Sequence, residues 1–114
     1  MISQARRFFS AGHGVKHLGV IGAGQMGTGI GIVASRVAGL NVTFIDPHAS
    51  NIEKSKNFVT NWCNKEIAKE RMTEADKTDV KNRMTFSGSE DALKDVDFVV
   101  EAATENFEIK KLIF

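Results

Sequence analysis

Disulfide bonds, membrane spans and a strong net charge are all missing from this sequence of 114 residues. Its single cysteine, Cys63, has no partner for an internal disulfide and no nearby Cys or His with which to bind a metal, so no metal site is expected. No apolar run approaches the roughly 18 residues that predict a membrane-spanning helix. The formal net charge is +1, so charge indicates neither a nucleic-acid nor a membrane partner. A hydrophobic content of 42% is ordinary for one globular domain with a modest core.

Acidic residues are also missing from the N-terminal part of the chain. The first acid is Asp46, whereas arginines stand at positions 6 and 7 among small polar residues. An acid-free N-terminus that carries arginine is typical of a mitochondrial transit peptide, and residues 7–10 resemble its processing site, with cleavage after Phe9. We therefore expect residues 1–14 to be a transit peptide that directs the protein to the mitochondrial matrix. A disordered basic tail without a targeting role is the alternative.

The most informative stretch is the glycine-rich segment from Val20 to Gly27. Residues 18–21 are an apolar run, which predicts a buried strand, and the run breaks at Gly22. The glycines then follow G-x-G-x-x-G spacing. Gly22 permits a tight turn, Gly24 lets the backbone approach a pyrophosphate, and Gly27 lets the next helix pack closely on the strand. The N–H groups at the start of that helix face the phosphates.

The residues around this turn favour a dinucleotide-binding unit. The next helix is expected over residues 25–38, before Gly39. Its predicted apolar face consists of Met26, Ile30, Val33, Ala34 and Val37. A second strand, residues 41–45, stops at Asp46, about 20 residues beyond the fingerprint, where a carboxylate binds a ribose 2′-hydroxyl and repels a 2′-phosphate. The pattern favours NAD over NADP. The alternative is a flavodoxin-like or other doubly wound domain that binds no dinucleotide.

Two further helices are predicted after Asp46. A capping-box pattern at Ser50 predicts a helix that runs to about Arg71, and Thr73 begins another that ends near Asn82. Because this pair is longer than a minimal crossover, we expect it to project beyond the sheet.

Strands are also expected over residues 84–87 and 96–102, with a single turn at residues 89–93 between them. The sequence thus predicts an α/β fold, a Rossmann-type doubly wound parallel sheet of about four strands in the order 3-2-1-4. A last helix should start near Asn106. Because residues 107–114 form an amphipathic helical pattern without a stop signal, we expect an N-terminal piece of a longer protein or a truncated gene model.

Three segments form a combination more specific than the glycine turn alone: residues 22–30, 44–46 and 97–106, followed by Lys110. Together they resemble the NAD-binding domain of 3-hydroxyacyl-CoA dehydrogenases, of the short-chain 3-hydroxybutyryl-CoA type. The resemblance implies NAD-dependent oxidation of an L-3-hydroxyacyl-CoA to the 3-ketoacyl-CoA in fatty-acid β-oxidation. It implies that residues 15–114 are an incomplete NAD-binding domain, and that the helical dimerisation domain of a homodimeric full-length enzyme is absent.

The resemblance also implies roles for single residues. The glycine turn would hold the pyrophosphate, Asp46 the adenosine ribose, and Glu105 and Lys110 would line the NAD site. The implied cofactor-binding residues are Gly22, Ala23, Gly24, Gln25, Met26, Gly27, Asp46, Glu105 and Lys110. Glu105 falls just past the carboxyl end of a strand beside the first strand, where ligands bind in open α/β sheets. From the residues alone, a solvated charge at a helix start is the alternative for Glu105 and Lys110.

An acyl-CoA substrate is the implied partner, and Lys69 matches a family lysine that contacts CoA. The predicted helix that contains Lys69 is basic, which suits CoA phosphates, although an ordinary solvated helix face would have the same composition. A serine that contacts CoA in the family corresponds to residues 60–63, which are Thr, Asn, Trp and Cys here. That departure puts this second contact in doubt.

No catalytic residue is assigned. The family's catalytic His, the Glu that orients it and a further serine lie beyond this domain. His13 falls in the predicted transit peptide, His17 opens the first strand, and His48 is a loop residue after Asp46. The first hypothesis is therefore the cofactor domain of a mitochondrial 3-hydroxyacyl-CoA dehydrogenase, inactive alone. The alternative is a short product that holds NAD or a partner protein without catalysis.

Overall fold

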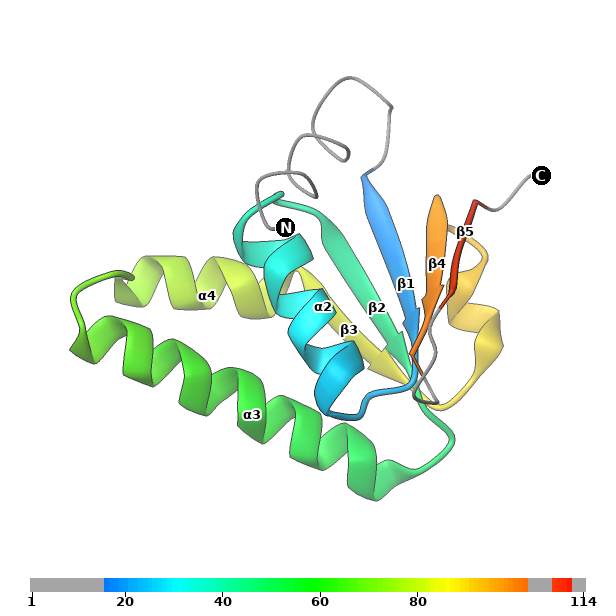
Figure 1. Cartoon of the computed structure of the whole chain (residues 1–114), viewed down its shortest axis with the longest axis horizontal. Helices are drawn as coiled ribbons and strands as arrows, with labels where there is room; N and C mark the ends of the chain where they lie inside the picture. The colour runs from blue at the N-terminus through cyan, green and yellow to red at the C-terminus, as the bar shows by residue number, and fades with distance from the viewer. Residues whose placement is uncertain (1–15, 103–107, 112–114) are drawn as a thin grey trace.

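A computed structural model of the chain describes residues 16–102 and 108–111 (Figure 1). The predicted transit peptide, residues 1–14, lies outside the described residues. Strands and helices alternate along the rest of the chain. The elements are β1 (His17–Ile21), α2 (Gln25–Arg36), β2 (Asn41–Ile45), α3 (Ala49–Ala68), α4 (Glu74–Asn82), β3 (Met84–Ser87), the 3₁₀ helix η1 (Glu90–Leu93), β4 (Phe98–Glu101) and β5 (Glu108–Lys111).

The sheet has the order β3-β2-β1-β4-β5. β1 lies between β2 and β4 and is parallel to both, and β2 is parallel to β3. This confirms the predicted Rossmann-type arrangement of four parallel strands in the order 3-2-1-4. Ile21 at the end of β1 is in register with Ile45 of β2 and Glu101 of β4, so the carboxyl ends of these strands meet at one edge. Ligands bind at this edge in open α/β sheets.

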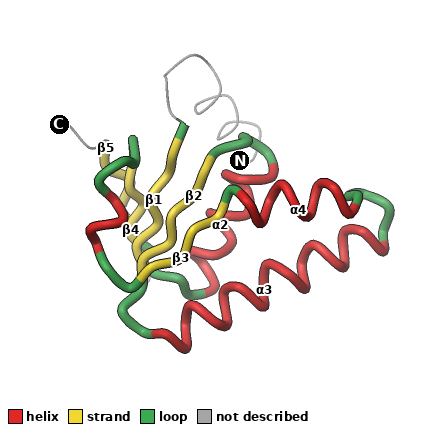
Figure 2. Tube along the Cα trace, turned by 180° about the vertical axis from the view of Figure 1, so that it is seen from behind, coloured by secondary structure: helices red, strands yellow, loops and turns green. Residues whose placement is uncertain are grey.

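The helices cover the two faces of the sheet unequally (Figures 1 and 2). α2 packs on β1 and β2 on one face, whereas η1 lies on the other, where a Cβ on Gly19 would be 2.6 Å from the Leu93 side chain. α3 and α4 form an antiparallel hairpin that reaches beyond the sheet, as expected from the length of this crossover. None of the described helices is long and apolar enough to cross a membrane.

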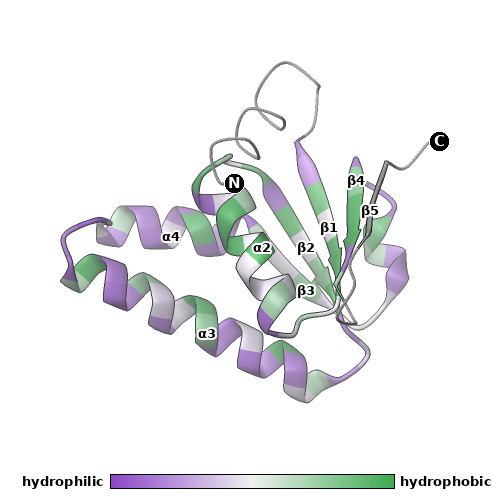
Figure 3. Ribbon diagram, viewed as in Figure 1, coloured by the Kyte–Doolittle hydropathy of each residue, from purple (hydrophilic) through white to green (hydrophobic). Residues whose placement is uncertain are grey.

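Hydrophobic residues from the central strands form the core. Strand residues such as Leu18, Val20, Val42 and Phe44 are fully buried. Side chains on both faces of these strands are covered, as expected for a parallel sheet. Figure 3 shows that hydrophobic residues lie along the strands, whereas much of α3 and α4 is hydrophilic.

The face that α2 turns to the sheet differs from the predicted one. Its buried residues are Gly27, Thr28, Gly31, Ile32, Ala34 and Ser35. Met26, which the apolar pattern placed on the inner face, is 44% exposed. The reason is the short distance between helix and sheet, because a Cβ on Gly31 would lie 2.1 Å from the Phe44 ring. Small residues permit that approach, and large apolar ones would hold the helix away.

The predicted start of α3 is wrong by two residues. Its N-cap is His48, whose side chain makes no capping bond, and Ser50 lies inside the helix. The Asp46 carboxylate binds the backbone N–H of His48 at 2.9 Å and fixes the chain just before the helix. α3 also ends at Ala68, earlier than predicted.

The start of α4 is as predicted. Thr73 accepts a hydrogen bond from the Asp76 N–H, and Asp76 accepts one from the Thr73 N–H, which completes a capping box.

The last predicted helix is also wrong over residues 108–111. These residues form β5, an antiparallel strand on the outer edge of β4, with Ile109 opposite Val100. Without β5, β4 would expose its backbone N–H and C=O groups at the sheet edge. A short connection is enough to bring an antiparallel strand back to that edge. Edge pairing therefore overrides the local helical pattern of this segment.

The close packing of α2 can be tested with two glycines of the same helix. Gly31→Ala should destabilise the fold by about 1–3 kcal/mol, because the new methyl overlaps the Phe44 ring, which stacks on Phe86 at 4.8 Å. Gly29→Ala is the matched control: nothing lies within 4 Å of its added Cβ, so higher helix propensity should stabilise the fold by about 0.5–1 kcal/mol. Urea unfolding followed by circular dichroism measures both. Equal effects of the two substitutions would contradict the close packing.

Candidate functional site

Two glycines set the geometry of the turn between β1 and α2. Gly22 has a φ of 102°, a region that favours glycine, and its N–H donates to the Ile45 carbonyl at 2.7 Å. A Cβ on Gly27 would lie 1.9 Å from the Gly22 carbonyl oxygen. Any side chain at Gly27 would therefore push α2 away from the turn. The two glycines hold the start of α2 close to the ends of β1 and β2.

The N-terminus of α2 is open. Gly24 is the N-cap and provides no side-chain cap, and the first turn contains no acid. A Cβ on Gly24 would have no heavy atom within 4 Å. The helix dipole and the N–H groups of the first turn favour an anion at this position, and Gly24 leaves room for the anion to approach the backbone.

The Asp46 carboxylate lies beside this turn and is 5% exposed. Its Oδ2 accepts from the Ala23 N–H at 2.9 Å and from Asn51 Nδ2 at 3.2 Å. Its Oδ1 accepts from the His48 N–H at 2.9 Å and lies 3.2 Å from His48 Nδ1. Burial alone would raise the pKa of Asp46, but the accepted hydrogen bonds from His48, Ala23 and Asn51 outweigh burial and lower it. A buried carboxylate, charged at neutral pH, is thus tied to the glycine turn.

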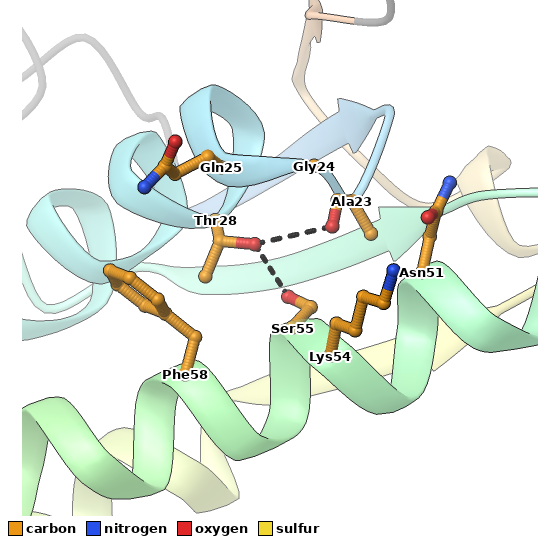
Figure 4. A pocket seen from close by; sticks show the side chains of 8 residues that line it. All are labelled: Ala23, Gly24, Gln25, Thr28, Asn51, Lys54, Ser55 and Phe58. Atoms are coloured by element: carbon orange, nitrogen blue, oxygen red, sulfur yellow. Dashed lines mark hydrogen bonds between the residues drawn. The ribbon is translucent and has the colours of Figure 1, made fainter.

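A pocket of about 200 Å³ lies between this turn and α3 (Figure 4). Its lining residues are Ala23, Gly24, Gln25, Thr28, Asn51, Lys54, Ser55 and Phe58. The buried hydroxyls of Thr28 and Ser55 are 2.7 Å apart and tie α2 to α3 at the pocket floor. Pockets for drug-sized ligands measure about 300–1,000 Å³, so this one has room for part of a dinucleotide rather than the whole molecule.

Half of this lining comes from α3 and was not among the residues assigned from the sequence. Asn51, Lys54, Ser55 and Phe58 are spaced by three, one and three residues, which is the spacing of one helix face. The signal was therefore present in the sequence. Three of the four residues are polar, so this face does not follow the apolar periodicity that indicates a buried helix face.

The residues of the predicted fingerprint take different positions around the pocket. Ala23, Gly24 and Gln25 line it. Gly22 is buried in the turn, and Gly27 is buried in the first turn of α2. Met26 is exposed and does not line this pocket. The structure brings Asp46 to the same turn, because β2 lies directly beside β1.

The remaining predicted site residues lie elsewhere or outside the described part. Lys69 is the C-cap of α3, fourteen residues beyond Ser55, so about 21 Å of helix separates them. The backbone of Lys110 lies opposite Val99 in β5, which is the edge strand of the sheet, and not on a helix. Glu105 lies outside the described residues.

Other reactive side chains lie away from the pocket. His17 is at the opposite end of β1, with Nε2 2.6 Å from Thr43 Oγ1. Cys63 is fully buried in α3, and burial raises the pKa of its thiol. Within residues 16–102 and 108–111, no group of three or more His, Cys, Asp or Glu residues could hold a metal ion.

The family model described as "3-hydroxyacyl-CoA dehydrogenase, NAD binding domain" matches residues 17–114. The chain belongs to this family. The domain is therefore an NAD-binding domain, and its cofactor is NAD. The sequence resemblance is confirmed at the level of the family.

Curated relatives and solved structures agree with this assignment. A 3-hydroxybutyryl-CoA dehydrogenase of Bradyrhizobium diazoefficiens is 37% identical over 100 residues, which are 88% of this chain and 34% of the relative. The mitochondrial hydroxyacyl-coenzyme A dehydrogenase of Rattus norvegicus is 37% identical over 107 residues, with 88% of this chain and 33% of the relative covered. The crystal structure of (S)-3-hydroxybutyryl-CoA dehydrogenase from Ralstonia eutropha matches with a TM-score of 0.75 and 42% identity, over 81% of this chain and 32% of that chain. This 3-hydroxyacyl-CoA dehydrogenase domain thus spans about a third of the length of these relatives.

The residues of the turn fit the chemistry of NAD. The open helix terminus at Gly24 suits a phosphate, and the charged Asp46 carboxylate beside it suits the hydroxyl groups of a ribose. Lys54 adds a cation to the same pocket (Figure 4). A helix terminus that suits an anion and a carboxylate that suits sugar hydroxyls therefore lie on the two sides of one backbone turn.

Because its folded-state pKa is lowered, Asp46 should stabilise the fold above its ordinary pKa of 3.8, and this contribution should disappear as pH falls through the lower folded-state value. We expect Asp46→Asn to be less stable than the original chain by about 1–3 kcal/mol at pH 7, because charge-assisted hydrogen bonds are lost. The difference should shrink when the pH is lowered to about 3. Urea unfolding at both pH values measures it. A constant difference would contradict a charged role for Asp46 in the turn.

Proposed function

We propose that this chain is the NAD-binding part of an oxidoreductase that converts L-3-hydroxyacyl-CoA to 3-ketoacyl-CoA in fatty-acid metabolism. When bound, NAD supplies the hydride acceptor for this oxidation. The contribution of the chain is to hold and orient the cofactor. The observation that supports this best is the direct bond between the Ala23 N–H of the glycine turn and the Asp46 carboxylate at 2.9 Å.

The proposed binding residues act in two groups. The turn from Gly22 to Gly27 holds the pyrophosphate at the N-terminus of α2, where the uncapped N–H groups favour an anion. Asp46 binds the adenosine ribose from the end of β2. Glu105 and Lys110 stay proposals from the family resemblance, because the structure describes neither side chain.

Charge repulsion at Asp46 is proposed to select NAD over NADP. The carboxylate is buried, and its hydrogen bonds favour its charged form. A 2′-phosphate would bring a second negative charge to a group that water screens poorly. The cost falls only on NADP, because NAD has a neutral hydroxyl at that position.

Acyl-CoA is the proposed substrate, with Lys69 as a phosphate contact. Lys54 and Lys69 lie on the same helix but about 22 Å apart along its axis, so one phosphate group cannot reach both. An extended ligand that lies along α3 would reach both. The bacterial and rat relatives are named as hydroxybutyryl-CoA and hydroxyacyl-coenzyme A dehydrogenases, which supports this substrate class.

The chain alone is proposed to lack catalysis. Removing the hydroxyl proton of the substrate requires a base within hydrogen-bond reach. Of the two histidines in the described part, His17 lies at the far end of β1 and His48 contacts Asp46. Neither is placed as a free base at the pocket. The full-length form is proposed to be a homodimer that provides the base from its remaining part.

A location in the mitochondrial matrix is proposed from the basic, acid-free residues 1–14. The rat relative is named as mitochondrial, whereas other relatives are bacterial. The family assignment is compatible with this location.

The role of Asp46 can be tested by cofactor binding. Asp46→Ala should weaken NAD binding by about 10- to 100-fold, since charge-assisted hydrogen bonds contribute about 1.5–3 kcal/mol. NADP binding should weaken less or improve, because the repulsion between Asp46 and the 2′-phosphate is gone.

The matched control is Asp97→Asn. The Asp97 carboxylate also accepts two backbone N–H bonds, from Lys16 at 2.8 Å and His17 at 3.0 Å, but at the opposite end of β1. Calorimetry with both cofactors measures the effect. Unchanged selectivity in Asp46→Ala, or an equal change in Asp97→Asn, would refute the assignment.

The absence of catalysis can be tested separately. The 114-residue chain should bind NADH but should not reduce acetoacetyl-CoA above the rate without protein, because neither of the two described histidines lies at the pocket as a free base. Absorbance of NADH reports turnover, and the Ralstonia eutropha enzyme is the positive control. Clear turnover by the chain would refute this part of the proposal. Binding without turnover is also the result expected of a non-catalytic NAD-binding product.

A further inference from the structure

A second pocket, of about 240 Å³, lies between α3, α4 and the edge strand β3. Its lining residues are Lys56, Val59, Lys81, Met84 and Phe86. None of them lines the pocket beside the glycine turn, and none is a residue proposed to bind NAD or CoA. We call it the β3 pocket. It is a separate site of the domain.

The β3 pocket combines apolar side chains with two cations. Val59 is 2% exposed and Met84 9%, and Phe86 is half-buried. The other two lining residues, Lys56 and Lys81, are exposed. A ligand that fits this surface therefore has an apolar group flanked by negative charge.

The two lysines have neutral partners within the described part of the chain. Lys56 Nζ lies 5.5 Å from the centre of the Phe86 ring, and Lys81 Nζ donates to Thr60 Oγ1 at 3.1 Å. Among the described residues, neither lysine forms an ion pair, and no carboxylate lines the pocket. Both ammonium groups can therefore pair with an anionic ligand.

The edge of β3 adds backbone groups to this surface. β3 is the outer strand at the end of the sheet opposite β5 (Figure 2). The carbonyls of Arg83 and Ser87 accept hydrogen bonds of 2.8 and 3.1 Å from N–H groups in and just after β2. Because backbone groups alternate in direction along a strand, those of Met84 and Phe86 point away from β2. Within residues 16–102 and 108–111, no further strand pairs with them.

We infer that the edge of β3 and the β3 pocket bind an extended acidic segment of another protein. The segment adds a strand to the sheet, places an apolar side chain in the pocket, and faces Lys56 and Lys81 with carboxylates. Met84 and Phe86 contribute twice, with backbone at the edge and side chains in the pocket. Strand addition takes its affinity from backbone hydrogen bonds and its specificity from such pockets. The inference goes beyond the proposed function, because it concerns other residues.

A second copy of the chain fits this surface poorly. Two β3 edges paired about a twofold axis would bring Lys56 and Lys81 of both copies to the same face of one continuous sheet. Like charges that face each other across paired strands are destabilising. An acidic segment instead gives the same lysines opposite charges, so charge complementarity favours a different partner.

The probe is the capped peptide acetyl-Thr-Glu-Thr-Leu-Thr-Glu-Thr-amide. Threonine favours extended backbone, and alternation places Glu, Leu and Glu on one face. An NMR titration of the ¹⁵N-labelled full chain should give a dissociation constant on the order of 0.1–1 mM, with shifts at Met84 and Phe86. The same peptide with lysine in place of glutamate should not bind, because its charges repel Lys56 and Lys81.

Two pairs of substitutions test the role of the lysines. Lys56→Gln with Lys81→Gln should weaken binding of the acidic peptide by about 3- to 10-fold, as expected for two solvent-exposed ion pairs. The matched control is Lys65→Gln with Lys77→Gln, which also removes one charge from each helix. Lys77 donates to Asn64 at 2.9 Å, one helical turn from the Lys81 contact, and neither control lysine lines the pocket. The control should keep the original affinity.

Amide hydrogen exchange reports the strand pairing itself. With the acidic peptide at about four times its dissociation constant, exchange at Met84 and Phe86 should slow by about fivefold, because only the free fraction exchanges. The Thr85 N–H points toward β2 and should change little.

Four results would overturn the inference. They are no binding up to about 5 mM peptide, equal affinity for the acidic and basic peptides, equal losses in both pairs of variants, and unchanged exchange at Met84 and Phe86. Self-association of the chain through β3 would also overturn it, in favour of a second copy. NAD binding should be the same with and without the peptide, so these results leave the proposed function intact.

Discussion

The structure of the site depends on the hydrogen bonds between the glycine turn that follows β1 and the end of β2. The Ala23 N–H donates to the Asp46 carboxylate at 2.9 Å, and the Gly22 N–H donates to the Ile45 carbonyl at 2.7 Å beside it. These two bonds fix the start of α2 relative to the end of β2. The uncapped N-terminus of α2 and the carboxylate are therefore held at one spacing by bonds within the chain. Such preorganisation reduces the entropy that binding must overcome.

This spacing between the start of α2 and the end of β2 requires α2 to lie close to the sheet. Gly27 and Gly31 leave no room for a Cβ against the Gly22 carbonyl and the Phe44 ring. On the side facing α3, the buried hydroxyls of Thr28 and Ser55 form the contact. Small and hydroxyl-bearing residues thus replace the large apolar face of an ordinary amphipathic helix. The position of the helix N-terminus at the carboxyl edge of the sheet follows from this packing.

The features that could be predicted from the sequence are those with a local physical cause. The positive φ of Gly22 and the end of β2 at Asp46 follow from the spacing of glycines and from the apolar runs. The four parallel strands follow from the alternation of elements, and the capping box at Thr73 from two side chains three residues apart.

The features that could not be predicted depend on contacts between distant parts of the chain. The start of α3 is set by the Asp46 carboxylate, which also binds Ala23 across 23 positions. β5 forms because the outer edge of β4 has free backbone groups to pair with. Which strand lies at an edge depends on the order of the whole sheet. The inner face of α2 is decided by its distance from Phe44. The four residues of α3 that line the pocket have the spacing of one helix face, but most of them are polar. An apolar periodicity therefore does not indicate this face.

The most direct test of the account is an NMR titration of the ¹⁵N-labelled chain with NAD. Hydrogen bonds to the end of β2 already hold the backbone of the turn in place. Binding should therefore change the environment of only a small set of amides. The account predicts that the largest shifts fall on residues 22–27 and on Asp46 and His48, with the amides near His17 unchanged. Shifts that leave residues 22–27 unchanged, or that are spread over the far end of α3 and α4, would contradict it.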